Sequence, residues 1–152
     1  MKDGRRPSEL GLPSVADLLA QGPSFQFVDR LISVGEEFVV AELEVVPDSS
    51  ILRDHFPEDP LYPGVLMIEA MAQTASLIPR IERFLDTNTI PPRRGALGKV
   101  RSAAFYRPAR PGDTLVLLAT RGGMFGNLAE YSCTVCVEGT CIATSSLVLA
   151  YS

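Results

Sequence analysis

The chain has 152 residues, a hydrophobic fraction of 46% and a formal net charge of −4. A chain of this length forms one domain that buries about two-thirds of its unfolded surface, and its acidic balance argues against general nucleic-acid binding. We expect no secretory signal, because no apolar core follows the N-terminus. We also expect no membrane insertion, because the longest apolar run, residues 65–72, is short and contains Glu69.

The N-terminal third begins with residues 1–13, which are polar and rich in glycine and proline, and we predict a flexible arm there. The domain then spans residues 14–152. Ser14 is expected to cap a short helix that ends before Gly22. The patterns of apolar and polar residues over 24–34 and 38–46 predict two strands.

Residues 47–64 contain four prolines and are predicted to be a loop. The helix expected over 65–78 is apolar nearly all round, which predicts burial on every side, and Pro79 is expected to kink it or tighten its last turns. Four strand-like segments follow a second loop at 86–95. A lone buried helix needs a sheet around it, so we predict an α+β fold with a curved antiparallel sheet wrapped around one long central helix.

The three cysteines, Cys133, Cys136 and Cys141, are odd in number and clustered. A disulfide framework is disfavoured, and a cytoplasmic location is expected. Cys133 and Cys136 form a C-x-x-C on a strand-like pattern, which places them on opposite faces. We therefore expect the cysteines to serve packing, and we predict no metal site.

The chain's single histidine, His55, stands before the proline-rich loop, and a carboxylate, Glu69, stands inside the apolar helix. A lone histidine is commonly a surface or capping residue, but it can also be a catalytic base. A buried carboxylate needs a polar partner, a cavity or a subunit interface. Gly64 precedes the helix, where free N–H groups and the helix dipole favour a developing oxyanion. Base, acid and amide donor together can remove a proton next to a carbonyl.

Residues 55–76 read HFPEDPLYPGVLMIEAMAQTAS. This segment resembles the signature of the 3-hydroxyacyl-[acyl-carrier-protein] dehydratases of fatty-acid synthesis, H-F-P-x-x-P-x-x-P-G-V-L-x-x-E-A-M-A-Q, and these enzymes have the hotdog fold. FYRPARPGDTL at 105–115 resembles the family's F-x-R-P-x-x-P-G-D turn. The resemblance extends over residues 14–151, and we expect the same fold here.

The resemblance implies a reaction that needs no cofactor. His55 would take the α-proton of a 3-hydroxyacyl thioester, and Glu69, directly or through a water, would give a proton to the departing hydroxyl. The N–H of Val65, beside Gly64, would polarise the thioester carbonyl, and the product would be a trans-2-enoyl thioester. Substrate contacts are also expected from two aromatic residues that flank the site loop, Phe56 and Tyr62.

The resemblance also implies a homodimer with shared active sites, in which His55 faces Glu69 of the partner subunit, or a trimer of such dimers. Asp59-Pro60 resembles the bifunctional dehydratase/isomerases, but those carry aspartate where this chain has Glu69, so we expect dehydration without isomerisation. The family's usual "GID" is replaced by KVR at 99–101. This change predicts a specialised acyl substrate.

A cationic segment without acidic residues is expected to dock the acyl carrier protein, which is acidic. Its cations are Arg93, Arg94, Lys99, Arg101, Arg107 and Arg110. An ordinary solvated face is the alternative. Gln73, one turn after Glu69, could orient that carboxyl group or make a structural hydrogen bond.

Two other functions fit the same class of fold. A hotdog thioesterase would bind similar thioesters, but such enzymes generally lack this arrangement of histidine, loop, glycine and glutamate. A non-catalytic partner subunit of a dehydratase heterodimer would have no need of both His55 and Glu69. Formation of enoyl product, release of free thiol, or neither would distinguish the three.

Overall fold

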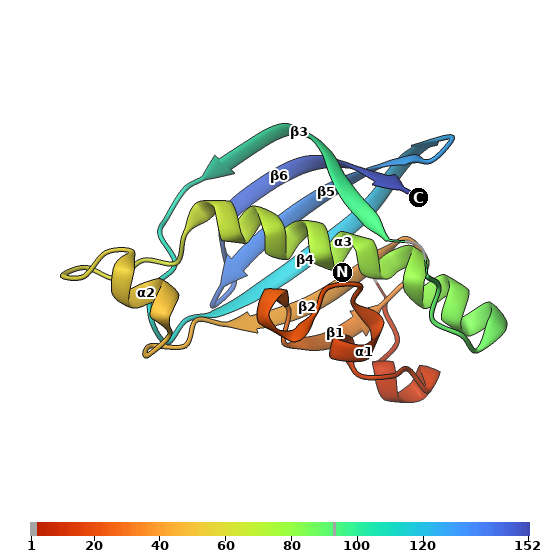
Figure 1. Cartoon of the computed structure of the whole chain (residues 1–152), viewed down its shortest axis with the longest axis horizontal. Helices are drawn as coiled ribbons and strands as arrows, with labels where there is room; N and C mark the ends of the chain where they lie inside the picture. Colours follow the sequence, from red (N-terminus) through yellow and green to blue (C-terminus); the bar gives the residue numbers. More distant parts are fainter. Residues whose placement is uncertain (1–2, 93) are drawn as a thin grey trace.

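Six antiparallel strands form one curved sheet that wraps around a long helix (Figure 1). The structure is a computed structural model that describes residues 3–92 and 94–152. The strands lie in the order β1-β2-β4-β5-β6-β3. Their bounds are β1 Arg30–Val34, β2 Phe38–Glu44, β3 Gly95–Phe105, β4 Thr114–Phe125, β5 Leu128–Val137 and β6 Thr140–Tyr151. The predicted fold is confirmed, and it is the hotdog arrangement.

The central helix, α3, spans Gly64–Thr87 and is buried on all sides from Ala70 to Ile78. This confirms the burial expected from its apolar residues. The helix continues for eight residues beyond Pro79, further than predicted. The loss of one backbone donor at Pro79 is tolerated because Arg80 and Ile81 beyond it are buried against the rest of the domain. Asn88 follows the last helical residue and caps the helix in the left-handed conformation, with φ 55°.

Alternation along the strands places one face of the sheet against α3. Leu115, Leu117 and Ala119 of β4 are fully buried, and so are Ala129 and Val135 of β5. Their neighbours along each strand are more exposed. The core therefore lies between the concave face of the sheet and the helix.

The segment predicted to be a flexible arm is tied to the domain in its described part. Arg5 and Val34 exchange backbone hydrogen bonds of 2.8 and 2.9 Å, which adds a short bridge to the edge of β1. A 3-10 turn, η1 (Pro7–Leu10), follows. Ser14 then caps α1 (Val15–Leu18), accepting a hydrogen bond from the Asp17 N–H, so the predicted cap is present but the helix is only one turn long.

Two predictions for the segments around the site need correction. The strand expected over 24–34 begins only at Arg30, because a 3-10 turn, η2 (Pro23–Phe25), occupies its start. The loop expected over 47–64 contains a short helix, α2 (Ser50–Asp54). Ser49 caps α2 by accepting from the Leu52 N–H, and Leu52 is buried in the core.

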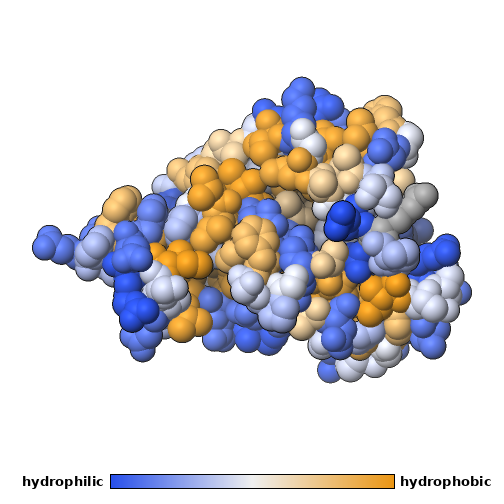
Figure 2. All heavy atoms as spheres, in the orientation of Figure 1, coloured by the Kyte–Doolittle hydropathy of each residue, from blue (hydrophilic) through white to orange (hydrophobic). Residues whose placement is uncertain are grey.

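Strand β3 forms one edge of the sheet and pairs only with β6 among the described residues. It is 11 residues long and exposed over most of its length. In Figure 2, apolar side chains gather on the face where β3 and the first half of α3 lie in Figure 1. Within residues 3–92 and 94–152, no helix has the length and apolar character required to span a membrane.

Candidate active site

His55 follows the last residue of α2 and caps its C-terminus. Its backbone N–H donates to Ile51 O at 3.1 Å, and its backbone oxygen accepts from the Leu61 N–H at 2.8 Å. The ring nitrogen Nδ1 lies 2.9 Å from Leu61 O. A carbonyl oxygen can only accept, so in the neutral ring Nδ1 carries the proton and Nε2 is left as the basic nitrogen. The loop 55–61 thus fixes the tautomer of the histidine.

Phe56, within this loop, and Tyr62, directly after it, are the two aromatic residues expected to contact the substrate, and they lie in different surroundings. The Phe56 ring stacks on the His55 imidazole with centroids 4.2 Å apart, and its side chain is about half exposed. Tyr62 is buried, and its hydroxyl has no hydrogen-bond partner among the described residues. Burial raises the pKa of Tyr62 far above its usual range, and Asp29 nearby adds to the rise. Tyr62 therefore stays a neutral phenol.

Gly64 begins α3, directly after the loop. The N–H groups of Leu66 and Met67 donate to Pro63 O at 3.0 and 3.2 Å, so those of Gly64 and Val65 precede the first helical hydrogen bond. Val65 is 73% exposed. A Cβ on residue 64 would lie 3.2 Å from the ring of Phe105. Glycine at this position therefore allows the Phe105 ring to pack closely against the start of α3.

Glu69 lies in the second turn of α3 and is partly buried. Its Oε1 accepts a hydrogen bond from Gln73 Nε2 at 3.0 Å. Gln73 is 1% exposed, and it also accepts from the Phe27 N–H at 2.8 Å and donates to Phe25 O at 2.9 Å. Gln73 therefore contacts the Glu69 carboxyl group and also makes structural hydrogen bonds.

Among the described residues of this chain, no hydrogen bond or ion pair joins His55 to Glu69. Each side chain is held separately, the histidine by Leu61 and the glutamate by Gln73. Sequence spacing gave no signal for Leu61, or for the Phe25–Phe27 segment that holds Gln73. These contacts depend on how the loop and the η2 turn fold back onto α3.

The predicted docking cations are distributed unevenly. Arg94, Lys99 and Arg101 are exposed on or beside β3, whereas Arg93 lies outside the described residues. Arg101 pairs with Glu130, which offsets its charge. Arg110, from the same cationic segment, pairs with Asp59 of the site loop at 2.8 Å.

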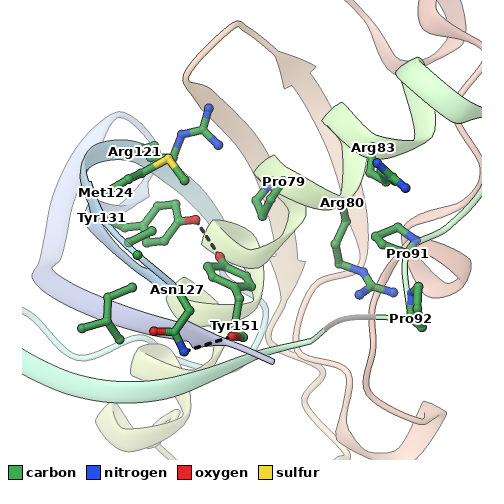
Figure 3. Close-up of a pocket in the computed structure, with 13 residues that line it drawn as sticks. Pro79, Arg80, Arg83, Pro91, Pro92, Arg121, Met124, Asn127, Tyr131 and Tyr151 are labelled. Carbon is green, nitrogen blue, oxygen red and sulfur yellow. Dashed lines mark hydrogen bonds between the residues drawn. The ribbon is translucent and has the colours of Figure 1, made fainter.

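A cavity lies beside the second half of α3, where Pro79, Arg80 and Arg83 line it (Figure 3). It has a volume of about 600 Å³ and lies between α3, the loop before β3 and the β4–β5 hairpin. Tyr131 and Tyr151 meet in it with hydroxyl oxygens 2.6 Å apart. The cavity is lined by Pro79, ten residues beyond Glu69 along the helix, so it is not part of the site described above.

Comparison with known proteins identifies the family to which the chain belongs. Residues 19–146 match the model of the FabA-like domain. The chain is 33% identical over 124 residues to the 3-hydroxyacyl-[acyl-carrier-protein] dehydratase FabZ of Brucella melitensis, covering 81% of this chain and 76% of that one. It is 31% identical over 144 residues to FabZ of Listeria welshimeri, covering 94% and 96%. The chain therefore belongs to the FabA-like family of dehydratases, and it is an enzyme of the hydro-lyase class.

Solved structures agree on the fold. The dehydratase heterocomplex ApeI:P from Xenorhabdus doucetiae superposes with a TM-score of 0.79 at 18% identity, covering 92% of this chain and 91% of that one. A thioesterase from Haemophilus influenzae gives a TM-score of 0.63 at 15% identity, covering 91% and 87%. Dehydratases and thioesterases share this scaffold, so the scaffold alone does not determine the activity.

Proposed function

We propose that this protein removes water from 3-hydroxyacyl thioesters carried on an acyl carrier protein and forms trans-2-enoyl thioesters. The observation that carries the proposal is the contact of His55 Nδ1 with Leu61 O, which leaves Nε2 as a positioned base. The relatives named as dehydratases of such thioesters support the choice of substrate.

In the proposed reaction, His55 Nε2 takes a proton from the carbon next to the thioester carbonyl. The electron pair of that C–H bond forms the C2–C3 double bond, and the C3–O bond breaks. Glu69 supplies the proton with which the hydroxyl leaves as water. The N–H groups at Gly64 and Val65 stabilise the negative charge that develops on the carbonyl oxygen. A net proton transfer from the imidazolium to the carboxylate then restores the starting state.

We place each His55 opposite Glu69 of the partner subunit in a homodimer. The edge strand β3, which pairs only with β6 in the described part of the chain, supports this arrangement, because a long exposed edge strand tends to pair with another chain. Leu97, Val100 and Phe105 of β3 are each 39–45% exposed, although they are large apolar residues. A second copy of the chain would cover them and complete two sites, and further association into a trimer of dimers remains part of the proposal.

The acyl carrier protein is proposed to dock where Arg94 and Lys99 offer positive charge. Both are exposed, and neither makes an ion pair within the described part of the chain. The net charge of −4 makes this local cationic surface unlike the rest of the molecule. A cytoplasmic location belongs to the same proposal, because the odd, clustered cysteines favour a reducing compartment.

The decisive experiment incubates the protein with 3-hydroxyacyl and enoyl thioesters and follows both enoyl absorbance and free thiol. Enoyl formation without thiol release supports dehydration. Thiol release would instead identify a thioesterase, and no reaction would identify a non-catalytic subunit. His55→Ala and Glu69→Gln should each abolish water loss, and full activity in either variant would refute the assigned roles.

A further inference from the structure

Cys136 and Cys141 are directly opposite residues in the β5–β6 hairpin. The hairpin turn consists of Glu138 and Gly139, both with positive φ, 50° and 78°. A two-residue turn of this kind encloses a hydrogen-bonded pair, here Val137 and Thr140. The next pair, Cys136 and Cys141, is therefore of the non-hydrogen-bonded type, in which side chains approach most closely.

This register brings the two cysteines within the range of a disulfide. Opposite residues in a non-hydrogen-bonded pair have Cα atoms about 4.5 Å apart, and disulfides span Cα separations from about 4.4 to 6.8 Å. The two side chains leave the same face of the sheet. The pair that the C-x-x-C spacing suggested, Cys133 and Cys136, does not, because Cys133 faces α3 and is 2% exposed.

The two thiols differ in their access to solvent. Cys141 is exposed and Cys136 is partly buried. Burial raises the pKa of the Cys136 thiol, and the neighbouring Cys141 adds to the rise. Cys141 is thus the thiol that meets a reagent first, and Cys136 lies behind it. No group of three or more potential metal ligands occurs in the described parts of the chain, so the two sulfurs are better suited to thiol chemistry than to holding a metal.

We propose that Cys136 and Cys141 form a redox-active dithiol that exchanges with low-molecular-weight disulfides such as oxidised glutathione. The Cys141 thiolate attacks one sulfur of the reagent, and a mixed disulfide forms as one thiolate leaves. The Cys136 thiolate then attacks the Cys141 sulfur, and the second thiolate leaves. The two protein protons go to the departing thiolates, so the protein is oxidised by two electrons and the reagent is reduced to two thiols.

The dithiol lies next to the part of the hairpin that holds the end of β3. Ile142 follows Cys141, and its carbonyl accepts a hydrogen bond from the Tyr106 N–H at 2.7 Å. A register shift between Val135 and Cys136 leaves Ile142 without an opposite residue on β5. A cross-link at 136–141 should limit fraying of the hairpin end. Oxidation should therefore slow hydrogen exchange at the Tyr106 amide.

The test equilibrates the reduced full-length protein in glutathione buffers of graded redox potential, then blocks free thiols and analyses intact protein and peptides by mass spectrometry. We expect an internal link between Cys136 and Cys141, reversed by dithiothreitol, and slower exchange at the Tyr106 amide. In the Cys136→Ser variant, the exchange reaction should stop at a glutathione adduct on Cys141. Cys133→Ala, the matched control, should form the same internal link as the natural chain.

Three results would overturn the proposal. They are a stable glutathione adduct on Cys141 while Cys136 is present, a link that uses Cys133, and a link between two chains. None of these readouts depends on dehydration, so the dithiol and the proposed catalytic function can fail independently.

Discussion

Gln73 Nε2 donates a 3.0 Å hydrogen bond to Glu69 Oε1, one turn away on α3. The orientation of the Gln73 amide is determined by its other contacts, because the Phe27 N–H can bond only to an oxygen. The amide nitrogen must then face Glu69. With Oε1 occupied as an acceptor, Oε2 is the oxygen left to carry and deliver a proton. Gln73 is thus a positioning residue for the proposed acid.

Replacing Gln73 should lower both activity and stability. Gln73→Ala leaves Glu69 free to rotate and removes partners from Phe25 O and the Phe27 N–H. We expect kcat to fall roughly 10- to 100-fold with little change in KM, and the free energy of unfolding to fall by about 2–3 kcal/mol. Steady-state kinetics and urea denaturation measure the two effects.

Thr74→Ala is the matched control for Gln73→Ala. Thr74 is buried on the same helix, and its hydroxyl donates only to Ala70 O, at 2.8 Å. This variant should lose stability and keep kcat. If both variants lost kcat equally, Gln73 would have no role specific to Glu69.

The shared active site predicts complementation between two inactive variants. Homodimers of His55→Ala and of Glu69→Gln each lack one group in both sites. A mixed dimer has one site with both groups intact and one with neither. Random exchange of subunits should therefore restore about a quarter of the natural activity, since half the dimers are mixed and each has one working site. Dehydration measured after co-refolding tests this, and no recovery despite mixed dimers would place each site within one chain.

Carrier docking predicts an effect that depends on the substrate. Arg94→Glu with Lys99→Glu should raise KM for carrier-bound substrate and leave KM for a small pantetheine thioester unchanged, and the difference should shrink as salt is added. Arg5→Glu, beside the opposite edge of the sheet, is the control. An equal loss with both substrates would mean that the two cations act on the fold or the site.

The fold and the site motif could be predicted because they depend on local patterns. Two-residue alternation marked β2, the last four strands were recognisable as strand-like segments, and an apolar segment without glycine marked α3. The His55-to-Glu69 segment was recognisable because it matches a family signature at nearly every fixed position. Neither conclusion required knowledge of contacts between distant residues.

The parts that the sequence did not reveal depend on long-range contacts. The helix α2 lies in a proline-rich segment that is typical of a loop. It is stabilised by one cap, Ser49, and one buried residue, Leu52. Strand β1 is shorter than its pattern because Gln73, 48 residues away, captures the Phe25 carbonyl. The C-x-x-C spacing does not indicate the pairing of Cys136 with Cys141, because this pairing depends on the register of the β5–β6 hairpin.

An ion-pair network far from the proposed chemistry gives a pH-dependent prediction. Arg121 on β4 bonds Glu37 at 2.7 Å and Glu82 of α3 at 2.5 Å, and the Arg121 side chain is 10% exposed. The hydrogen bond from Arg121 holds the pKa of Glu37 below its ordinary value of 4.5, although burial opposes this shift. The pair joins the β1–β2 turn to the sheet, while the bonds to Glu82 join α3 to the sheet.

The stabilisation from a carboxyl group with a lowered folded pKa is fully present above its unfolded pKa and is lost as pH falls through the folded value. Unfolding at pH 7 and at successively lower pH below 4.5 should therefore show the Glu37 contribution disappearing. Glu37→Gln should cost at most about 1 kcal/mol at pH 7, because Glu37 is largely exposed, and nothing at low pH. Glu36→Gln, at an exposed neighbouring carboxyl group, should change neither value. If Glu37→Gln cost the same at every pH, the ionised pair would not be the source of the stabilisation.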